Sequence, residues 1–587
     1  MVKKLMESIR EQKKNSILAM VTISGEVVFE VIIPLLMANL IDYGIDMGDM
    51  GYIVKMGIVL LLSALGQLFC GAISGKFAAI ASSGFARNLR HDMFYKVQNY
   101  SFSNIDKFST ASIVTRLTTD VTNLQNTYQM IIRMAVRSPL MAIFSLVAAF
   151  GIDAKLSLIF LAIIPVLVLG LYFIMTRTHP IFERVFRTYD KLNSVVQENL
   201  HGIRVVKSFV REDHENKKFT GISENIYKDF KKAEQQLAWN APLMQLCMYA
   251  AVLLLSWFGA RTIVACGGDA ATGLSTGELL SLLSYATQIL MSLMGLSMIF
   301  VMLTMSRTSG ERVVELLNET PDITTPENAV KSVPDGSIDF EHVQFSYRHG
   351  TEGKPVLSDI NLHIPAGATV GFIGGTGSSK SSFVQLIPRL YDVDLGAVKV
   401  GGIDVRKYDL DTLRGDVAMV LQKNVLFSGT IKDNLRWGDE NATDEEIRHA
   451  CQLAQADDFI QTFPKGYDTY IEQGGTNVSG GQKQRLCIAR ALLKKPKILI
   501  LDDSTSAVDT RTDALIRGAF AKEIPNTTKI IIAQRIASVQ GADMILVLDD
   551  GKIVSCGTHD ELMQTSPIYR EVYESQTKGD PDNATAS

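Results

Sequence analysis

The 587-residue chain has few cysteines, and the six that it has are scattered. No two of them form a C-x-x-C pair, which disfavours both a disulfide framework and a zinc site, so we expect buried free thiols. The net charge is only −4, so no excess of positive charge predicts binding to nucleic acid. The cysteines are Cys70, Cys247, Cys266, Cys451, Cys487 and Cys556.

The N-terminal sequence, MVKKLMESIREQKKNS, lacks the small-residue cleavage site of a signal peptide. The apolar run that follows is too long for a signal peptide, and we expect it to remain as a membrane span.

Hydrophobic residues make up 47% of the chain and the mean hydropathy is +0.14, which is too apolar for a soluble enzyme of this length. Six apolar runs in the first half approach the roughly 20 residues that cross a bilayer. The third is long enough only if its helix starts near Met130. The runs are Ser16–Ile41, Tyr52–Ser74, Ser138–Gly151, Leu156–Met175, Leu243–Ala265 and Leu279–Met305.

The connections between these runs alternate in length and charge. The three short ones contain a single basic residue, Lys155, whereas the two long ones, Lys76–Arg137 and Thr176–Pro242, carry many. The positive-inside rule therefore places the long connections, the N-terminus and the second half of the chain in the cytoplasm. Helical periodicity in the long connections predicts helices that continue beyond the membrane. We expect a multi-pass protein of the inner or plasma membrane.

Charged and methionine-rich positions in the spans have two interpretations each. Glu26 and Glu30 share one helix face, where they could attract cationic substrates in a cavity or pair with basic residues of a neighbouring helix. We expect Arg133 and Arg137 to anchor at the inner interface. The methionines of MSLMGLSMIFVMLTM could line an adaptable pocket, or they could pack or face lipid.

Composition changes after Glu319. Residues 320–336 are rich in Pro, Thr and Asp and indicate a linker. Short β-branched runs alternating with helical stretches then predict an α/β domain with a largely parallel sheet over residues 337–575, followed by a disordered tail, 576–587. The expected fold is an all-α, six-helix transmembrane domain over residues 1–319 joined to an α/β domain over residues 337–575.

The stretch GGTGSSKSS follows an apolar strand and precedes a predicted helix, SFVQLIPRLY. Strand, glycine-rich loop and helix are the context of a phosphate-binding loop, whose backbone N–H groups would surround phosphate at a helix N-terminus. Lys380 would reach the β- and γ-phosphates, and Ser381 would offer its hydroxyl to Mg²⁺. The candidate ATP-binding residues of this loop are Gly374, Gly375, Thr376, Gly377, Ser378, Ser379, Lys380, Ser381 and Ser382.

Ser379 stands where the usual loop pattern has glycine. If its backbone is left-handed, the added Cβ costs about 1–2 kcal/mol. Each charge-assisted contact to phosphate contributes about 1.5–3 kcal/mol, so we expect the loop to bind nucleotide despite this substitution.

Further motifs support a nucleotide site. KILILDD is a buried strand ending in acids, of which Asp502 could hold Mg²⁺ through water, and Gln422 follows the strand VAMVL. VSGGQKQR opens another helix with Ser479, Gly480, Gly481 and Gln482. Asp509 closes the segment after the acidic strand.

These motifs, in this order, resemble the nucleotide-binding domain of ATP-binding cassette (ABC) transporters, and nearly the whole chain resembles bacterial multidrug exporter half-transporters of the type IV fold. The resemblance implies that residues 374–381 are Walker A, Gln422 is the Q-loop and a Mg²⁺ ligand with Ser381 and Asp502, and Asp509 ends the D-loop. It further implies that Tyr347 stacks on adenine, and that Ser479–Gln482 form the signature that contacts a partner's ATP. NIDKFSTASIVTRLTTDV and GIRVVKSFVRED resemble the loops whose coupling helices dock on nucleotide-binding domains.

Two catalytic positions depart from the family. Asp503 stands where a glutamate usually polarises water, and Gln534 stands where a switch histidine is usual. A carboxylate displaced by about 1 Å can cost on the order of 100-fold in rate, and glutamine cannot be cationic. We therefore expect the slow-site subunit of a heterodimer whose partner carries the glutamate and histidine. A homodimer that tolerates both changes is the alternative.

The expected function is ATP-driven export of multidrug or lipophilic small molecules by alternating access, with ATP and Mg²⁺ as cofactors and membrane lipid and a second half-transporter as partners. A lipid flippase of similar architecture is one alternative. An ATP-binding regulatory or channel-like subunit that does not pump is another. The sequence does not name the substrate.

Overall fold

The computed structural model describes residues 1–266, 273–347, 354–503 and 508–577. The chain divides into two compact units: Met1–Gln98 with Thr110–Glu319, and Asn99–Ser109 with Thr320–Ser587. The first unit is helical, and the second contains the sheets. The short segment Asn99–Ser109, which the sequence places within the membrane half, thus clusters with the second unit.

Among its described residues, the first unit contains six helical stretches that are long and apolar enough to span a membrane, as the sequence predicts. Two of its helices have 49 and 48 residues, which at 1.5 Å per residue is more than twice the roughly 30 Å of a bilayer core. The prediction that helices continue beyond the membrane is therefore confirmed. The helices are α1 (Val2–Glu7), α2 (Lys13–Leu40), α3 (Met50–Gln98), α5 (Thr110–Thr115), α6 (Val121–Ile152), α7 (Ala154–His201), α8 (Ile203–Ser208), α9 (Glu212–Leu237), α10 (Asn240–Cys266) and α11 (Thr276–Asn318).

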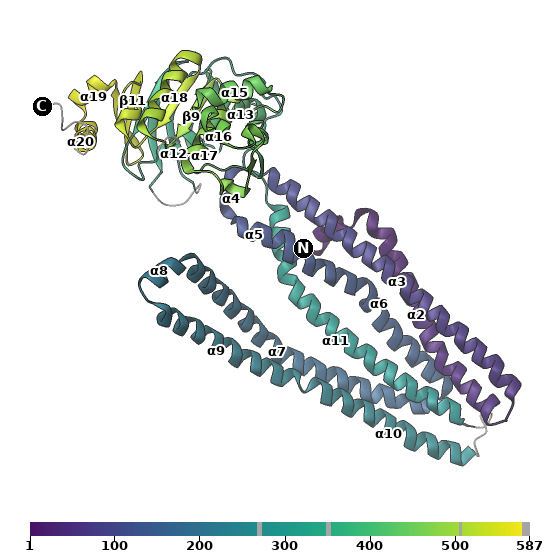
Figure 1. Cartoon of the computed structure of the whole chain (residues 1–587). Helices are drawn as coiled ribbons and strands as arrows, with labels where there is room; N and C mark the ends of the chain where they lie inside the picture. The colour runs from purple at the N-terminus through teal and green to yellow at the C-terminus, as the bar shows by residue number, and fades with distance from the viewer. Residues whose placement is uncertain (267–272, 348–353, 504–507, 578–587) are drawn as a thin grey trace. The chain divides into compact units, whose positions relative to one another are not determined.

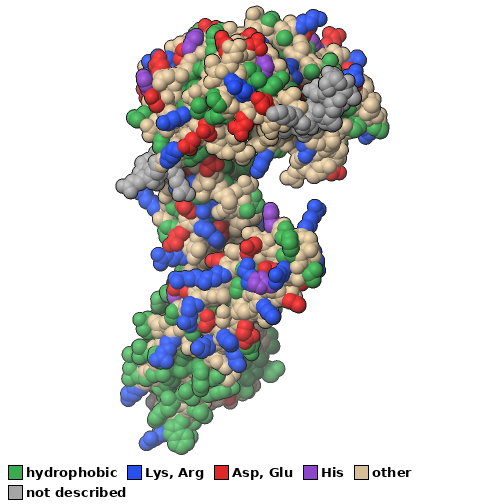
Figure 2. Space-filling view, turned by 90° about the vertical axis from the view of Figure 1, so that its left-hand side faces the viewer, with side chains coloured by type: hydrophobic (Ala, Val, Ile, Leu, Met, Phe, Trp, Pro, Cys, Tyr) green, Lys and Arg blue, Asp and Glu red, His purple; other side chains and the backbone are tan. Residues whose placement is uncertain are grey.

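Helices α2, α3, α6 and α11 lie side by side, while α7 and α9 form a long pair joined through α8 (Figure 1). A buried core joins α2, α6, α7, α10 and α11, with Leu167, Leu255 and Tyr285 among its fully buried members. Figure 2 shows hydrophobic side chains gathered over one end of this unit, where charged side chains are sparse. This surface suits contact with lipid.

The second unit is built on a six-stranded sheet in the order β12-β11-β3-β10-β9-β6. All neighbouring pairs are parallel except β11 with β12, as the sequence predicts. Successive residues of β9 point into two different hydrophobic cores, one on each face of the sheet. Ile498 and Ile500 belong to one core, and Leu499 and Leu501 belong to the other. Both faces of the strand are thus buried, which accounts for its continuous apolar run. The strands are β3 (Thr369–Ile373), β6 (Val417–Val420), β9 (Ile498–Asp502), β10 (Thr528–Ile532), β11 (Met544–Asp549) and β12 (Lys552–Gly557).

A second, antiparallel sheet has the order β2-β1-β4-β5. The predicted strand at 337–347 belongs to this sheet, whereas the sequence pattern predicts a single, largely parallel sheet. Its strands are β1 (Ile338–Phe345), β2 (Leu357–Ile364), β4 (Leu395–Val400) and β5 (Ile403–Asp404), and a further pair is β7 (Gly429–Thr430) with β8 (Tyr470–Ile471).

The second unit also contains a set of mostly short helices. Helix α12 ends at Gln385, so the predicted helix 382–391 is too long; Pro388 disfavours helical geometry in the residue before it. The helices are α4 (Phe102–Lys107), α12 (Lys380–Gln385), α13 (Leu410–Asp416), α14 (Ile431–Leu435), α15 (Asp444–Leu453), α16 (Asp457–Thr462), α17 (Gly480–Leu493), α18 (Thr510–Glu523), α19 (His559–Thr565) and α20 (Pro567–Thr577).

Two residues assigned to the disordered tail, Gln576 and Thr577, are the last residues of α20. The rest of the predicted tail, 578–587, lies outside the described residues. The predicted linker 320–336 clusters with the nucleotide-binding unit.

Candidate functional site

The phosphate loop connects β3 to α12 at the carboxyl edge of the parallel sheet. Gly374 allows close packing at its start, because a Cβ there would lie 2.2 Å from the Leu548 carbonyl oxygen. Gly377 has φ +87°, a conformation that glycine adopts readily. Local sequence thus dictates a turn that brings successive N–H groups to the start of a helix.

Ser379 adopts the left-handed conformation, with φ 71° and ψ 20°, directly before α12. This is the conformation considered for it from the sequence, so its Cβ carries a cost of about 1–2 kcal/mol relative to a right-handed backbone. The chain nevertheless closes the loop, and the Ser379 carbonyl accepts from the Phe383 N–H at 3.0 Å in the first turn of the helix.

The Lys380 ammonium lies over the loop. Its Nζ donates to the carbonyl oxygens of Gly374 and Gly375 at 2.8 and 2.9 Å, and to Ser378 Oγ at 3.1 Å. Burial lowers the pKa of Lys380, while the nearby carboxylates of Asp502 and Asp503 raise it. A cation held in this way is positioned for an anion in the loop.

Ser381 and Asp502 meet across the site, since Ser381 Oγ donates to Asp502 Oδ1 at 3.1 Å. Asp502 ends the buried strand β9 and is only 3% exposed. Burial raises its pKa, and the neighbouring Asp503 adds to the rise, while the Ser381 hydrogen bond opposes it. A hydroxyl and a carboxylate fit Mg²⁺, which prefers oxygen ligands. The described residues hold no cluster of three His, Cys, Asp or Glu side chains, so such an ion would also need water and phosphate oxygens.

Asp503 and Gln534, the two residues that depart from the family pattern, contact each other. Gln534 Nε2 donates to Asp503 Oδ2 at 2.7 Å, and Gln422 also hydrogen-bonds the Asp503 side chain. Strands β9 and β10 are parallel neighbours, so their carboxyl ends bring these residues together. Burial raises the pKa of Asp503, although both amides and Lys380 favour its ionised form.

Gln576 is a residue of the site that none of the sequence motifs indicates. Its side-chain amide donates to the Gln534 carbonyl oxygen at 2.8 Å, and its Oε1 accepts from the Ile536 N–H at 2.8 Å. Helix α20 thereby holds the segment that carries Gln534. Only an amphipathic pattern extended through Gln576 could have indicated this contact from sequence.

Tyr347 lies beside α12, where its hydroxyl shares a 2.8 Å hydrogen bond with Ser382 Oγ. The hydroxyl also donates to Gln385 Oε1 at 3.3 Å. The ring packs edge-on against Phe345 and Tyr391, and the residue is 42% exposed. An exposed ring next to the loop is able to stack on a nucleotide base.

The predicted signature forms the N-terminus of α17. Ser479 caps the helix: its hydroxyl accepts from the Gln482 N–H at 3.3 Å, and its own N–H donates to Gln482 Oε1 at 2.9 Å. Ser479 and Gly480 are exposed. Asp509 similarly caps α18 by accepting from the Thr512 N–H. Within the described ranges, no hydrogen bond joins Ser479–Gln482 or Asp509 to the phosphate loop.

In the membrane unit, Glu26 and Glu30 of α2 face Arg137 of α6. Arg137 Nη2 donates to Glu30 Oε2 at 2.7 Å, and Arg137 Nε lies 3.6 Å from Glu26 Oε1. These contacts match the interpretation in which the glutamates pair with a basic residue of a neighbouring helix. Arg137 therefore pairs with both glutamates, and its anchoring at the inner interface stays a prediction.

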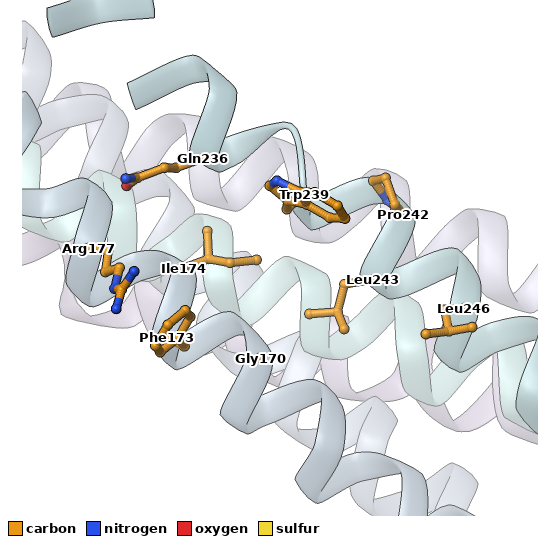
Figure 3. A pocket seen from close by; sticks show the side chains of 9 residues that line it. All are labelled: Gly170, Phe173, Ile174, Arg177, Gln236, Trp239, Pro242, Leu243 and Leu246. Carbon is orange, nitrogen blue, oxygen red and sulfur yellow. The ribbon is translucent and has the colours of Figure 1, made fainter. Parts of the chain in front are cut away.

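A cavity of about 530 Å³ lies where α7 meets the junction of α9 and α10. Figure 3 shows Ile174 and Leu243 between the helices, with Arg177 and Gln236 toward one end. The Arg177 guanidinium lies 4.4 Å from the centre of the Phe173 ring. The lining contains none of the acidic residues or methionines considered from the sequence; it consists of Gly170, Phe173, Ile174, Arg177, Gln236, Trp239, Pro242, Leu243 and Leu246.

Comparisons with known proteins agree with this architecture. Residues 16–293 match the model of the ABC transporter transmembrane region, and residues 357–506 match that of the ABC transporter. The uncharacterized ABC transporter ATP-binding protein YfiB of Bacillus subtilis is 36% identical over 559 residues, covering 95% of this chain and 96% of that protein.

A fatty acid ABC transporter ATP-binding/permease protein of Mycobacterium bovis is 33% identical over 486 residues, covering 82% of this chain and 75% of that protein. A solved bacterial Atm1-family ABC exporter with ATP bound has the same fold, with a TM-score of 0.82 at 22% identity over 96% of this chain and 99% of that chain. Six apolar helices and this fold make the protein a multi-pass membrane protein with a cytoplasmic ATPase domain. The chain belongs to the ABC transporter family, as a half-transporter whose ATPase domain is coupled to transport.

Proposed function

We propose that this chain is the slow-site subunit of a heterodimeric ABC exporter. The observation that carries the proposal is the 2.7 Å hydrogen bond from Gln534 Nε2 to Asp503 Oδ2. Aspartate is one methylene shorter than the usual glutamate, and here its carboxylate is also tied to the residue at the switch position. Both features weaken the polarisation of an attacking water, for which a displacement of about 1 Å can cost on the order of 100-fold.

ATP binds in the phosphate loop through the backbone N–H groups of residues 375–381, with Lys380 at the β- and γ-phosphates. Ser381, Gln422 and Asp502 would hold Mg²⁺, which would neutralise phosphate charge when bound. The exposed face of Tyr347 carries the adenine. The Ser381–Asp502 contact and the position of Tyr347 beside α12 support these assignments.

The partner is a second half-transporter that carries the glutamate and the histidine at the corresponding positions. Ser479, Gly480 and Gly481 of this chain complete the partner's ATP site at the positive end of α17. The intact sequence of this segment and its exposure support a role in trans. ATP binding clamps the two domains together, and this closure drives alternating access in the membrane.

The transported molecule is small and lipophilic. Support comes from the largely apolar cavity between α7 and α10, and from the M. bovis relative named as a fatty acid transporter. Glu26 and Glu30 add a second hypothesis, in which they attract cations, although their pairing with Arg137 favours a structural role.

The proposal is tested by the ATPase rate of the chain reconstituted alone and with its partner. Alone, the chain should turn over at least tenfold more slowly than the complex. Asp503→Glu with Gln534→His should raise the rate of the chain alone by about 10- to 100-fold, because the carboxylate regains its reach. Lys380→Ala added to this double variant should abolish the gain and so exclude a contaminating ATPase.

Two outcomes would contradict the proposal. Equal turnover with and without a partner indicates a homodimer that tolerates aspartate and glutamine. A partner that also lacks the glutamate, with slow hydrolysis at both sites, indicates an ATP-binding regulatory subunit that does not pump.

A further inference from the structure

Helix α4 is held against the nucleotide-binding unit by two separate sets of contacts. The first set joins it to the segment that follows α11. Ser101 Oγ donates to Asp322, Ser103 Oγ donates to Asp322 Oδ2 at 2.6 Å, and Asn104 Nδ2 donates to the Thr320 carbonyl oxygen at 3.1 Å. These contacts fix the start of the helix.

The second set joins α4 to one side chain of the nucleotide-binding unit, Tyr391. The Tyr391 hydroxyl donates to Asp106 Oδ2 at 2.6 Å, and the rings of Tyr391 and Phe102 lie 6.1 Å apart. Burial raises the pKa of the Tyr391 hydroxyl, and the Asp106 carboxylate adds to the rise, so the hydroxyl remains a donor. Hydrogen bonds to a carboxylate are about twice as strong as neutral ones.

Tyr391 has little freedom to move away from this contact. It is 9% exposed and lies between Arg389 and Asp392, which form two hydrogen bonds of 2.8 and 3.0 Å. Arg389 itself is buried and has φ 51°. Its carbonyl accepts from Arg414 at 2.9 Å. The loop therefore presents the Tyr391 ring in one orientation.

The other side of the Tyr391 ring meets Tyr347. The two rings lie 5.1 Å apart at an interplanar angle of 88°, a favourable edge-to-face geometry. Tyr347 in turn shares its hydroxyl with Ser382 in α12, two residues after Lys380. A continuous series of contacts thus runs from α12 through Tyr347 and Tyr391 to Asp106 in α4.

We propose that Tyr391 is a positioning residue that links the base-binding ring of Tyr347 to α4, so that α4 responds to the purine base of the nucleotide bound by the same chain. This inference rests on the proposed function, because it takes Tyr347 as the surface on which the base stacks. A base stacked on Tyr347 restricts its ring, which orders Tyr391 and strengthens the contact with Asp106. Thermodynamic linkage requires the reciprocal effect: ordering of α4 tightens binding of the base.

The experiment measures amide hydrogen exchange of residues 99–109 in the full-length chain. Exchange is compared without ligand, with saturating ATP and Mg²⁺, and with saturating tripolyphosphate and Mg²⁺, which occupies the loop without a base. ATP affinity is measured in parallel by equilibrium binding. The test variant is Tyr391→Phe, which removes the hydroxyl and keeps the ring.

The matched control is Tyr408→Phe. Tyr408 is fully buried in the same unit and donates to the Val400 carbonyl oxygen at 2.7 Å, so it loses a hydrogen bond of similar length away from α4. This control separates a general loss of stability from loss of the contact with Asp106.

ATP should slow exchange in α4 about fivefold or more, within the usual range of coupling between sites, and tripolyphosphate should not. Tyr391→Phe should abolish this protection while ATP still binds, and Tyr408→Phe should retain it. Equal protection by tripolyphosphate overturns the inference, since the signal would then come from the phosphate loop. The inference is also overturned if ATP slows exchange in α4 as much in Tyr391→Phe as in the unmodified chain. It is likewise overturned if bound ATP does not slow exchange in α4 of the unmodified chain. Failure to bind ATP at all contradicts the proposed function itself.

Discussion

Ser379 shows how one residue can depart from a motif without removing its geometry. Its left-handed backbone costs about 1–2 kcal/mol as serine, whereas glycine would adopt it freely and lose about 0.5–1 kcal/mol in chain entropy. Ser379→Gly should therefore stabilise the chain by at most about 1.5 kcal/mol. Thermal unfolding measures this effect. The Kd for ATP should stay unchanged, because the substitution leaves the backbone N–H groups that bind phosphate in place.

The same substitution at Ser382, inside α12, serves as the control. Glycine in a helix interior costs up to about 1 kcal/mol, so Ser382→Gly should lower the melting temperature and also remove the contact with Tyr347. A destabilised Ser379→Gly variant would show that the left-handed serine is not strained.

Asp503 provides a prediction on pH. Burial raises its pKa in the folded state, so at neutral pH the folded protein bears a cost for its charge. This cost is absent when the pH is below the pKa of Asp503 in the unfolded chain, near 3.9. It grows as the pH rises from that value to the higher pKa of the folded state, and it is fully present above both. Asp503→Asn, which keeps an acceptor for Gln534, should raise the melting temperature of the nucleotide-free chain by a few degrees at pH 7. The gain should vanish near pH 4; a gain independent of pH would contradict this account.

At the level of the helices, an ion pair connects α2 to α6. Arg137 neutralises Glu30 and lies near Glu26, so Arg137→Gln leaves two carboxylates without a counter-charge. Loss of one partner of a fully buried pair costs about 3–5 kcal/mol, while loss of all charges is often nearly neutral. These side chains are 14–34% exposed, so Arg137→Gln should destabilise the chain in thermal unfolding by less than that, and adding Glu26→Gln and Glu30→Gln should restore much of the stability.

Transport distinguishes the two roles of the glutamates. Glu26→Gln with Glu30→Gln should reduce transport of cationic and neutral substrates equally if the pair is structural. A selective loss of cation transport would instead support an acidic substrate site. Failure of the triple variant to recover stability would show that the carboxylates do not depend on Arg137.

At the scale of the whole molecule, the two ATP sites of the proposed heterodimer should respond unequally to changes in this chain. Ser479→Ala acts on the partner's fast site, where removal of a preorganised donor costs about 100- to 1,000-fold. Lys380→Ala acts on the slow site and should reduce the ATPase rate of the complex only a few-fold. Steady-state ATPase assays of the complex measure both.

Thr443→Ala is the matched control, because Thr443 caps α15 with the same capping box as Ser479 caps α17. Thr443→Ala should leave the ATPase rate unchanged. A large effect confined to Ser479→Ala would then come from lost contact with the nucleotide and not from the loss of a helix cap. Equal losses from Ser479→Ala and Lys380→Ala would indicate two equivalent sites and contradict the heterodimer.

The sequence by itself determined the six spans, the parallel sheet, the order of the nucleotide motifs and the two departures at Asp503 and Gln534. These features depend on residues that are close along the chain, where hydrophobic periodicity and loop chemistry act locally. The phosphate loop is the clearest case, because strand, loop and helix are consecutive.

Only the tertiary structure decided which distant residues meet. The bond between Gln534 and Asp503 spans 31 residues, that between Arg137 and Glu30 spans 107, and that between Tyr391 and Asp106 spans 285. Such contacts depend on strand order and helix packing, which periodicity does not specify. For the same reason the sequence did not predict the second sheet or the two hydrogen bonds that Gln576 makes to the segment carrying Gln534. It also did not predict the contact of α4 with Tyr391.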